Sequence, residues 1–356
     1  MPLNLRLVRN SFSQAALQIG LVTALSIMPL FAAPAAAKDR VIAETVRIDG
    51  PRSGLKLGLR HVQSASQRRD VPTVLILHGT NVPTSGNADY PFGGRSMMTA
   101  LAETGMDVWG LDFYGFGTSD RYPEMLGEAD RHPPLGDAAE SADQVDAVVR
   151  YLQRRNGGRR IVLIGDSGGS LPAGIYATKK PSTISRLVLF GPITSRPIAD
   201  APSNPPAHRL VTPDKLWAAF AKWSAQAGSP EVLDSAMYKD WAATFLASDP
   251  TSSTRSPPSV RIPNGRAADT LAIAQGRFPY DPAKIEAPTL VVMGETDEVT
   301  TFAGAQWLLG ALRSAPHRRL VVIGHASHTI QFEAERNQLY DVMADFVHEK
   351  LDSSRK

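Results

Sequence analysis

The sequence predicts an α/β fold, with a mainly parallel eight-stranded sheet flanked by helices and a helical insertion. Two observations support this prediction. Short apolar runs rich in Val, Ile and Leu alternate with longer amphipathic segments, which is the pattern of strands joined by crossover helices. Several of these runs also stop at a glycine next to polar residues, and functional groups gather at such strand ends in open parallel sheets.

The eight predicted strands are short. The first two alternate apolar with polar residues, as expected for an edge pair with one exposed face, and the other six are predicted to be buried. The strands are Val41–Ile48, Leu55–His61, Thr73–Leu77, Asp107–Leu111, Ile161–Ile164, Leu187–Phe190, Thr289–Met293 and Leu320–Ile323.

Five helices are predicted between the strands and after the last one. In the second, Val145, Val148 and Leu152 recur at steps of three and four residues, while acidic side chains occupy the other face. The helices are Ser96–Glu103, Ala138–Gln153, Ser170–Lys179, Phe302–Ala315 and Glu333–Lys350.

Residues 195–281 interrupt this alternation. The segment is rich in proline, has no clear strand pattern and holds three of the five tryptophans. We interpret it as a helical cap inserted into a core made of residues 38–194 and 282–356. Aromatic residues spaced three or four apart can line one side of a helix, and those of a cap can cover an apolar pocket. The residues predicted to bind substrate are Asn81, Trp217, Phe220 and Trp241.

The first 37 residues are predicted to be a secretory signal peptide. Arg6 and Arg9 precede an apolar stretch, and the small residues that end at Ala37 form a cleavage site. The stretch is short and interrupted by a proline, which disfavours the alternative of a retained membrane anchor. We therefore expect a secreted or periplasmic protein, cut near Ala37, with no stable membrane insertion after cleavage.

Charge and cysteine content exclude some classes of function. The chain holds 38 Lys and Arg against 35 Asp and Glu, and removing the first 37 residues takes away two arginines and leaves a net charge of +1. Such a protein is not expected to bind nucleic acid or another polyanion. Because the chain has no cysteine, thiol catalysis is excluded. The composition implies no particular oligomeric state.

Ser167 is the predicted nucleophile. It lies in the segment GDSGG, residues 165–169, where the strand Ile161–Ile164 ends in a G-x-S-x-G turn. A serine hydroxyl is a poor nucleophile at neutral pH, so it must stand clear of the backbone, near a base and near amide donors. A sharp strand-to-helix turn does this, and the turn leaves little room beside the serine, which explains the flanking glycines.

An oxyanion hole is predicted next to this serine. The strand Thr73–Leu77 leads into HGTN, residues 78–81, a turn that can present a backbone N–H group at the carboxyl edge of the sheet. We expect Thr80 to supply one donor, with Asn81 as the alternative, and Gly168 to supply the other. His78 is interpreted as a structural residue that holds the loop.

A carboxylate after the strand Thr289–Met293 is predicted to orient the base. The strand ends in GETDE, residues 294–298, at the same edge of the sheet as the serine. Asp297 is the preferred acid, and Glu295 and Glu298 are the alternatives. The strand that ends at Phe190 continues in GPIT, which contains no carboxylate.

The predicted general base is His328, in the segment GHASH after the last strand. Glu333, at the head of the final predicted helix, follows it by five residues. His325 lies nearer the strand end and is the alternative base. A metal site on these two histidines is not expected, because no third ligand lies nearby at a recognisable spacing.

These motifs resemble the α/β-hydrolase family over nearly all of residues 41–350. The order Ser167, Asp297, His328 is the order that this fold uses. The segment DFYGFGTSD, residues 112–120, is also similar to the D-x-x-G-x-G-x-S segment of the family. The resemblance implies the α/β-hydrolase fold, a Ser-His-Asp triad and an acyl-enzyme formed on Ser167.

Departures from known patterns narrow the subfamily. GDSGG resembles the G-D-S-A-G-G of hormone-sensitive-lipase-like esterases, but HGTN stands where those enzymes carry H-G-G-G. Dehalogenases and epoxide hydrolases of this fold have an aspartate in place of Ser167, so an alkyl-enzyme ester is not expected. Trypsin-like proteases share GDSGG, but their His and Asp precede the serine in an all-β fold.

The resemblance implies a serine hydrolase that cleaves carboxylic esters without a metal or organic cofactor. The aromatic cap favours a small apolar or aromatic ester as substrate. Lactones, thioesters, amides and carbon–carbon bonds next to carbonyls are alternative substrates, and an acyltransferase would use the same acyl-enzyme. A non-catalytic binding protein on the same scaffold is the alternative from another class, although a binder has no physical need for nucleophile, acid and base together.

Overall fold

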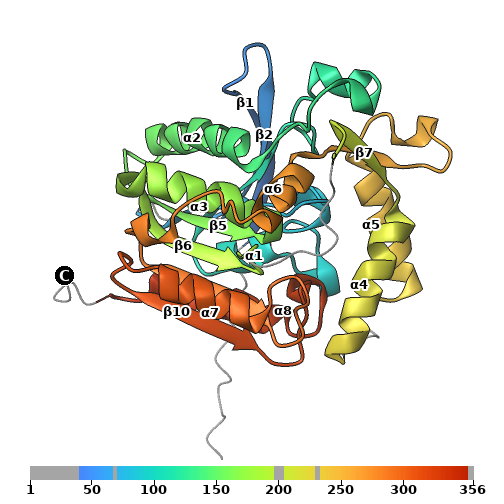
Figure 1. Cartoon of the computed structure of the whole chain (residues 1–356). Helices are drawn as coiled ribbons and strands as arrows, with labels where there is room; N and C mark the ends of the chain where they lie inside the picture. Colours follow the sequence, from blue (N-terminus) through green and yellow to red (C-terminus); the bar gives the residue numbers. More distant parts are fainter. Residues whose placement is uncertain (1–39, 67–69, 196–203, 229–232, 352–356) are drawn as a thin grey trace, which may run out of the picture. The chain divides into compact units, whose positions relative to one another are not determined.

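A computed structural model describes residues 40–66, 70–195, 204–228 and 233–351 (Figure 1). The predicted signal peptide lies outside these ranges, so its cleavage and the localisation that follows from it stay predictions. Within the described ranges, no helix combines the length and the hydropathy needed to cross a bilayer.

An eight-stranded sheet forms the centre of the fold, as predicted. Its strand order is β1-β2-β4-β3-β5-β6-β9-β10. β2 pairs antiparallel with both β1 and β4, and all other neighbours are parallel. The strands are β1 (Val41–Asp49), β2 (Lys56–Ser64), β3 (Thr73–Leu77), β4 (Asp107–Asp112), β5 (Ile161–Asp166), β6 (Ile184–Phe190), β9 (Thr289–Gly294) and β10 (Arg318–Ile323).

Helices cover both faces of the sheet. α2, α3 and α7 pack on one face, and α1 and α8 pack on the other. In β5, Ile161 and Leu163 contribute to the first core, while Val162 and Ile164 contribute to the second, because successive strand side chains point to opposite faces. The helices are α1 (Met97–Glu103), α2 (Ala138–Arg155), α3 (Ser170–Lys179), α7 (Phe302–Ala311) and α8 (Arg336–His348).

Two predicted helices are shorter than expected. α7 ends at Ala311 rather than at residue 315, because the next residues turn toward β10 and Pro316 disfavours helical backbone at the residue before it. α8 begins at Arg336 rather than at Glu333. The Glu333 side chain is instead fully buried next to the loop that carries His328.

The last strand corrects a further expectation. The sequence predicts that Leu320–Ile323 is buried, but β10 ends the strand order and has a neighbour along one edge alone. Val322 is 40% exposed as a result. A continuous apolar run does not distinguish a central strand from an edge strand, since both can be rich in branched residues.

The chain between β6 and β9 contains helices and a short ribbon of two strands. The expectation of no strand in this segment is wrong, because β7 (His208–Val211) and β8 (Val260–Pro263) pair antiparallel. α4 and α5 lie side by side (Figure 1), and the Trp217 ring of α4 is 5.3 Å from the Tyr238 ring of α5. The helices are α4 (Pro213–Ala227), α5 (Ser235–Ala247) and α6 (Gly265–Ala274). The limits of the cap, 195 and 281, remain a prediction.

Candidate active site

Ser167 lies at the sharp turn between β5 and α3. Its φ is +47°, a left-handed conformation that is uncommon outside glycine. A Cβ atom at Gly165 would lie 2.8 Å from the Ser170 Cα, and one at Gly169 would lie 2.6 Å from the His78 carbonyl oxygen. Close packing therefore requires glycine on both sides of the serine.

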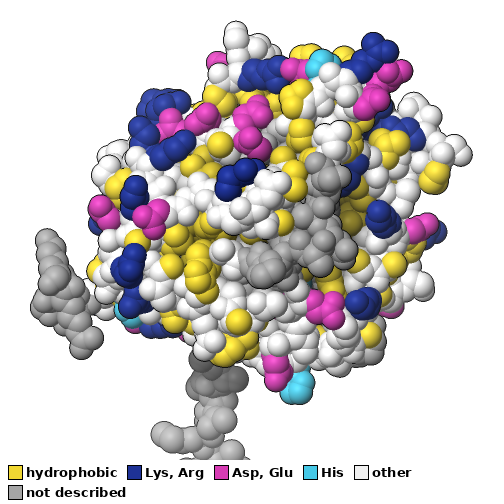
Figure 2. All heavy atoms as spheres, in the orientation of Figure 1, with side chains coloured by type: hydrophobic (Ala, Val, Ile, Leu, Met, Phe, Trp, Pro, Cys, Tyr) yellow, Lys and Arg dark blue, Asp and Glu magenta, His cyan; other side chains and the backbone are white. Residues whose placement is uncertain are grey.

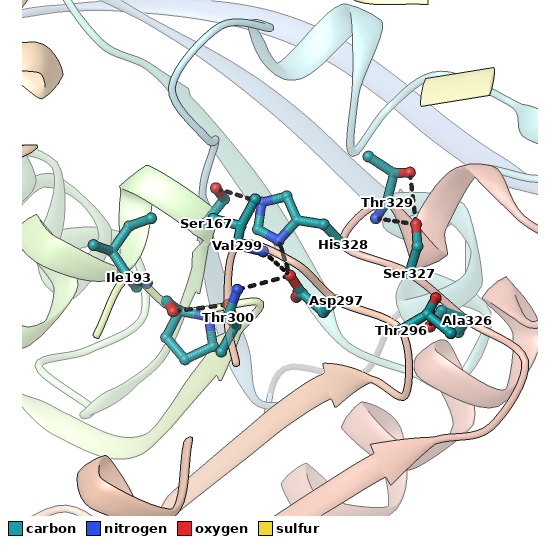
Figure 3. Close-up of polar contacts among 12 residues, drawn as sticks. Ser167, Ile193, Thr296, Asp297, Val299, Thr300, Ala326, Ser327, His328 and Thr329 are labelled. Atoms are coloured by element: carbon teal, nitrogen blue, oxygen red, sulfur yellow. Dashed lines mark hydrogen bonds and ion pairs between the residues drawn. The ribbon is translucent and has the colours of Figure 1, made fainter. Parts of the chain in front are cut away.

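Ser167, His328 and Asp297 form a continuous chain of hydrogen bonds (Figure 3). The Ser167 Oγ atom is 2.9 Å from Nε2 of His328. On the other side of the ring, Nδ1 is 3.0 and 3.1 Å from the two carboxylate oxygens of Asp297. Nδ1–H donates to the carboxylate, so Nε2 is the nitrogen that can accept the serine proton.

The Asp297 carboxylate is fixed by its own loop. Its Oδ1 atom accepts hydrogen bonds from the backbone N–H groups of Val299 and Thr300, at 2.8 and 2.7 Å (Figure 3). The Thr300 hydroxyl donates to the carbonyl oxygen of Pro192, at 2.8 Å, and so ties this loop to the one after β6. The carboxylate therefore has one orientation toward the imidazole.

The alternative acids and the alternative base lie elsewhere. Glu295 accepts a hydrogen bond from the His325 backbone N–H at 3.1 Å, and the His325 side chain is exposed. Glu298 is exposed and accepts a hydrogen bond from Gln226 of α4 at 2.9 Å. Of the candidate pairs, the structure brings Asp297 and His328 to the serine. Among the described residues, no three side chains of His, Asp or Glu are grouped to hold a metal ion.

A buried acid supports the loop that carries His328. The Glu333 carboxylate accepts hydrogen bonds from the Ser327 backbone N–H, at 2.8 Å, and from the Ser327 hydroxyl. Burial raises the pKa of Glu333. Sequence reasoning noted this residue but assigned it to the final helix, because spacing alone cannot show that a side chain turns back toward the preceding loop.

Gly191 allows the loop after β6 to approach the imidazole. Its φ is +50°, and a Cβ atom there would lie 3.1 Å from Cε1 and 3.2 Å from Nδ1 of His328. A contact of 3.1 Å is shorter than nine in ten real Cβ contacts, so the imidazole would have to shift by a few tenths of an ångström. This glycine is therefore needed both for its backbone conformation and for space at the ring.

The two predicted oxyanion donors lie next to each other. A Cβ atom at Gly168 would collide with the Thr80 hydroxyl and would lie 3.2 Å from the Thr80 backbone nitrogen. The His78 side chain connects this loop to the segment after β4. Its Nδ1–H donates to the Gly79 carbonyl at 2.8 Å, and its Nε2 accepts from the Phe113 N–H at 3.2 Å. Burial lowers the pKa of His78 to about 4, which agrees with its interpretation as a neutral structural residue.

Comparison with known families places this geometry in a wider context. A family model described as alpha/beta hydrolase fold matches residues 72–335, which include all three residues of the hydrogen-bonded chain. The chain belongs to the alpha/beta hydrolase fold family. The family accounts for the mainly parallel sheet and for the sharp turn that carries the serine.

Solved structures of the same fold resemble this hydrolase-fold chain at low identity. A serine hydrolase from the polyaromatic hydrocarbon-degrading bacterium Cycloclasticus zankles has a TM-score of 0.59 at 15% identity, over 85% of this chain and 97% of that one. A thioesterase domain from the curacin biosynthetic pathway has a TM-score of 0.57 at 17% identity, over 86% and 100%. A thermophilic esterase from Thermogutta terrifontis has a TM-score of 0.55 at 19% identity, over 86% and 100%.

A cavity of about 290 Å³ opens next to Ser167 in this α/β-hydrolase fold. Asn81 and Phe220, two of the residues predicted to bind substrate, border it, and Trp223 borders it as well. The Trp223 ring lies edge-on to the His328 ring, with 5.6 Å between the ring centres. The other apolar residues of the lining are Val82, Ile193, Val299 and Phe332.

Trp217 and Trp241 do not border the cavity, which corrects the prediction for both. Trp241 is fully buried, its ring stacks on Phe245, and its Nε1–H donates to the Gly86 carbonyl at 2.9 Å. Trp217 packs against Trp241, with 5.4 Å between the rings. In a helix a three-residue step turns the side chain by about 300°, so two such steps leave Trp217 and Trp223 about 120° apart. Of these two tryptophans, Trp223 faces the site and Trp217 does not.

One wall of the cavity is a polar chain that sequence reasoning missed. The Asn87 side-chain N–H donates to the Asp166 carboxylate at 2.6 Å, and Gln331 donates to the Asn87 side-chain oxygen at 3.3 Å. All three residues border the cavity. Burial raises the pKa of Asp166 to about 6. Asn87 and Gln331 belong to segments without a motif, so nothing in the sequence marks them.

Proposed function

We propose that the protein is a serine hydrolase that cleaves carboxylic esters through an acyl-enzyme on Ser167. The observation that carries this proposal is the unbroken chain of hydrogen bonds from Asp297 through His328 to the serine hydroxyl. In the proposed mechanism, Nε2 of His328 takes the proton from Ser167 as its oxygen attacks the ester carbonyl carbon. Asp297 holds the ring in the required tautomer and stabilises its protonated form.

The negative charge that forms on the carbonyl oxygen is stabilised by the backbone N–H groups of Thr80 and Gly168. Donors fixed before the reaction stabilise this charge without reorganising, and removal of one such donor commonly costs on the order of 100-fold in kcat. When the intermediate collapses, His328 gives its proton to the departing alcohol. Water then attacks the acyl-enzyme by the same steps and releases the acid.

The lining of the cavity supports a small or medium-sized substrate with an apolar part. Its volume of about 290 Å³ lies at the lower end of the range for small-molecule sites. Phe220 and Trp223 come from α4, between β6 and β9. We therefore propose that residues 195–281 act as a cap that shapes the pocket and selects the substrate.

Activity assays on a panel of substrates test the proposal. The panel contains 4-nitrophenyl esters of increasing acyl length, together with lactones, thioesters and amides, which the same acyl-enzyme chemistry could cleave. We expect ester hydrolysis by the native protein and a loss of about 10⁴-fold in kcat for Ser167→Ala. Ser182→Ala, an exposed position, is the control and should keep native activity. Undiminished ester hydrolysis by Ser167→Ala would overturn the proposal.

A further inference from the structure

Arg209 of β7 is a cation without an acidic partner among the described residues. Its guanidinium donates one hydrogen bond to the side-chain oxygen of Asn81, at 2.6 Å, and another to that of Asn264. Both acceptors are neutral amides. Burial lowers the pKa of Arg209, but arginine keeps its proton in proteins. Its neighbour Arg266, in contrast, is paired with Asp269 at 2.9 Å.

On the face shown in Figure 2, basic and acidic side chains lie intermingled, which agrees with a net charge close to zero. A half-buried arginine that is held by two amides has lost part of its hydration without gaining a counter-charge. Two of its five N–H groups are used in these bonds, one on each terminal nitrogen, and the other three can donate to a carboxylate.

The position of Arg209 connects it to the candidate active site. It borders a second cavity, open and about 610 Å³ in volume, that shares Thr80 and Thr270 with the cavity next to Ser167. Asn81, which accepts the hydrogen bond from Arg209, borders the first cavity. The cation therefore contacts the predicted oxyanion loop directly, through Asn81, and borders a cavity that adjoins the one next to Ser167.

We propose that Arg209 binds a carboxylate group of the substrate, so that the preferred esters carry a negative charge away from the bond that is cleaved. This inference rests on the proposed function and refines its substrate class. The apolar lining next to Ser167 would hold the part of the substrate around the ester, and the guanidinium would bind the charged end. Asn81 and Asn264 position the guanidinium and do not neutralise it.

Matched pairs of esters test this inference. One series contains 4-nitrophenyl monoesters of succinic, glutaric and adipic acid, each compared with its methyl-capped neutral analogue. A second series places the carboxylate on the leaving alcohol, as in 4-acetoxybenzoate compared with 4-acetoxybenzamide. The rates without enzyme are subtracted. The variants are Arg209→Gln, Arg209→Lys and, as the control, Arg261→Gln on the paired strand β8, outside both linings.

In at least one series, the native protein should prefer the charged ester in kcat/KM. Arg209→Gln should lower kcat/KM for that ester by about 10- to 100-fold and leave its neutral analogue within about threefold. Arg209→Lys should restore part of the preference, and Arg261→Gln should keep all of it. The inference is overturned if no charged ester is preferred, if the preference survives in Arg209→Gln, or if Arg209→Gln lowers both members of a pair equally.

A binding measurement separates this inference from the proposed function. Isothermal titration calorimetry of glutarate with the Ser167→Ala protein measures the Kd of the proposed anion site without turnover. We expect the Kd to weaken by about tenfold or more when Arg209→Gln is added to Ser167→Ala. If the native protein hydrolyses no ester but this difference is found, the proposed function fails and the anion site stands. If glutarate binds both proteins equally or neither, the anion site is overturned.

Discussion

The Ser167 Oγ atom lies 2.9 Å from Nε2 of His328, although 161 positions separate the two residues in the sequence. The parallel strands β5, β9 and β10 explain this proximity, because their carboxyl ends lie along one edge of the sheet. The serine follows β5, the aspartate follows β9 and the histidine follows β10. The proposed chemistry therefore depends on strand order as much as on the residues themselves.

His328→Ala should lower kcat for ester hydrolysis by on the order of 10³- to 10⁴-fold, because the serine then has no base within reach. His325→Ala is the matched control from the same loop. Its exposed side chain takes no part in the hydrogen-bonded chain described above, so native activity is expected. Steady-state assays of both variants check this, and a larger loss in His325→Ala would contradict the assignment of the base.

Asp297→Asn should lower kcat by on the order of 10³- to 10⁴-fold, because an amide in this position favours the wrong imidazole tautomer. The matched control is Glu298→Gln, one position away, whose side chain contacts Gln226 of α4. Far-ultraviolet circular dichroism should confirm that both variants are folded. Equal activity of the two variants would show that Asp297 does not orient the base.

Gly191→Ala should lower kcat by about 10- to 100-fold, because its Cβ would press on the imidazole at a distance of 3.1 Å and displace it. Gly54→Ala is the control, since Gly54 also has a positive φ, +79°, but nothing lies within 4 Å of a Cβ there. Both variants should lose about 1–2 kcal/mol of stability from backbone strain. If Gly191→Ala keeps full activity, the ring is not held as tightly as proposed.

Asp166→Asn should change the pH dependence of stability. Burial raises the pKa of Asp166 to about 6, above its ordinary value of 3.8, so folding takes up a proton between these pH values. In the native protein this group therefore lowers stability progressively as the pH rises from about 4 to about 6, and the full cost persists above pH 6. The unfolding free energy of the variant minus that of the native protein should therefore be larger at pH 8 than at pH 3.5. The expected increase is on the order of 2–3 kcal/mol.

Denaturant unfolding at several pH values measures this effect. The quantity to follow is the difference in unfolding free energy between Asp166→Asn and the native protein, which removes the contribution of all other titrating groups. A difference that does not vary between pH 3.5 and pH 8 would show that Asp166 titrates alike in the folded and unfolded chains.

Local sequence pattern predicted the sheet and the shape of the serine turn well, because both depend on neighbours in the chain. The boundaries of α3 match the prediction, since Ser170–Lys179 follows directly from the turn. The ribbon of β7 and β8 was missed because each strand has four residues and their stability comes from pairing across a long stretch of sequence. The exposure of β10 was missed because it depends on strand order.

The surroundings of the site were less predictable than the residues at the strand ends. Trp223 borders the cavity and Trp217 does not. The three-residue spacing suggested that they share one side of a helix, but residues six apart point about 120° away from each other. Glu333 turns back to Ser327, and Arg209 reaches Asn81 across 128 positions. Contacts of this kind are set by tertiary packing, so no periodicity or motif in the sequence carries them.

Covalent labelling of the nucleophile tests the central claim most directly. The native protein is treated with a fluorophosphonate, and the modified peptide is identified by mass spectrometry, with Ser167→Ala and His328→Ala treated in parallel. We predict one stoichiometric adduct on Ser167, none in Ser167→Ala, and much slower labelling in His328→Ala. An unlabelled Ser167 in folded protein that hydrolyses esters, or an adduct at a different serine, would contradict the claim.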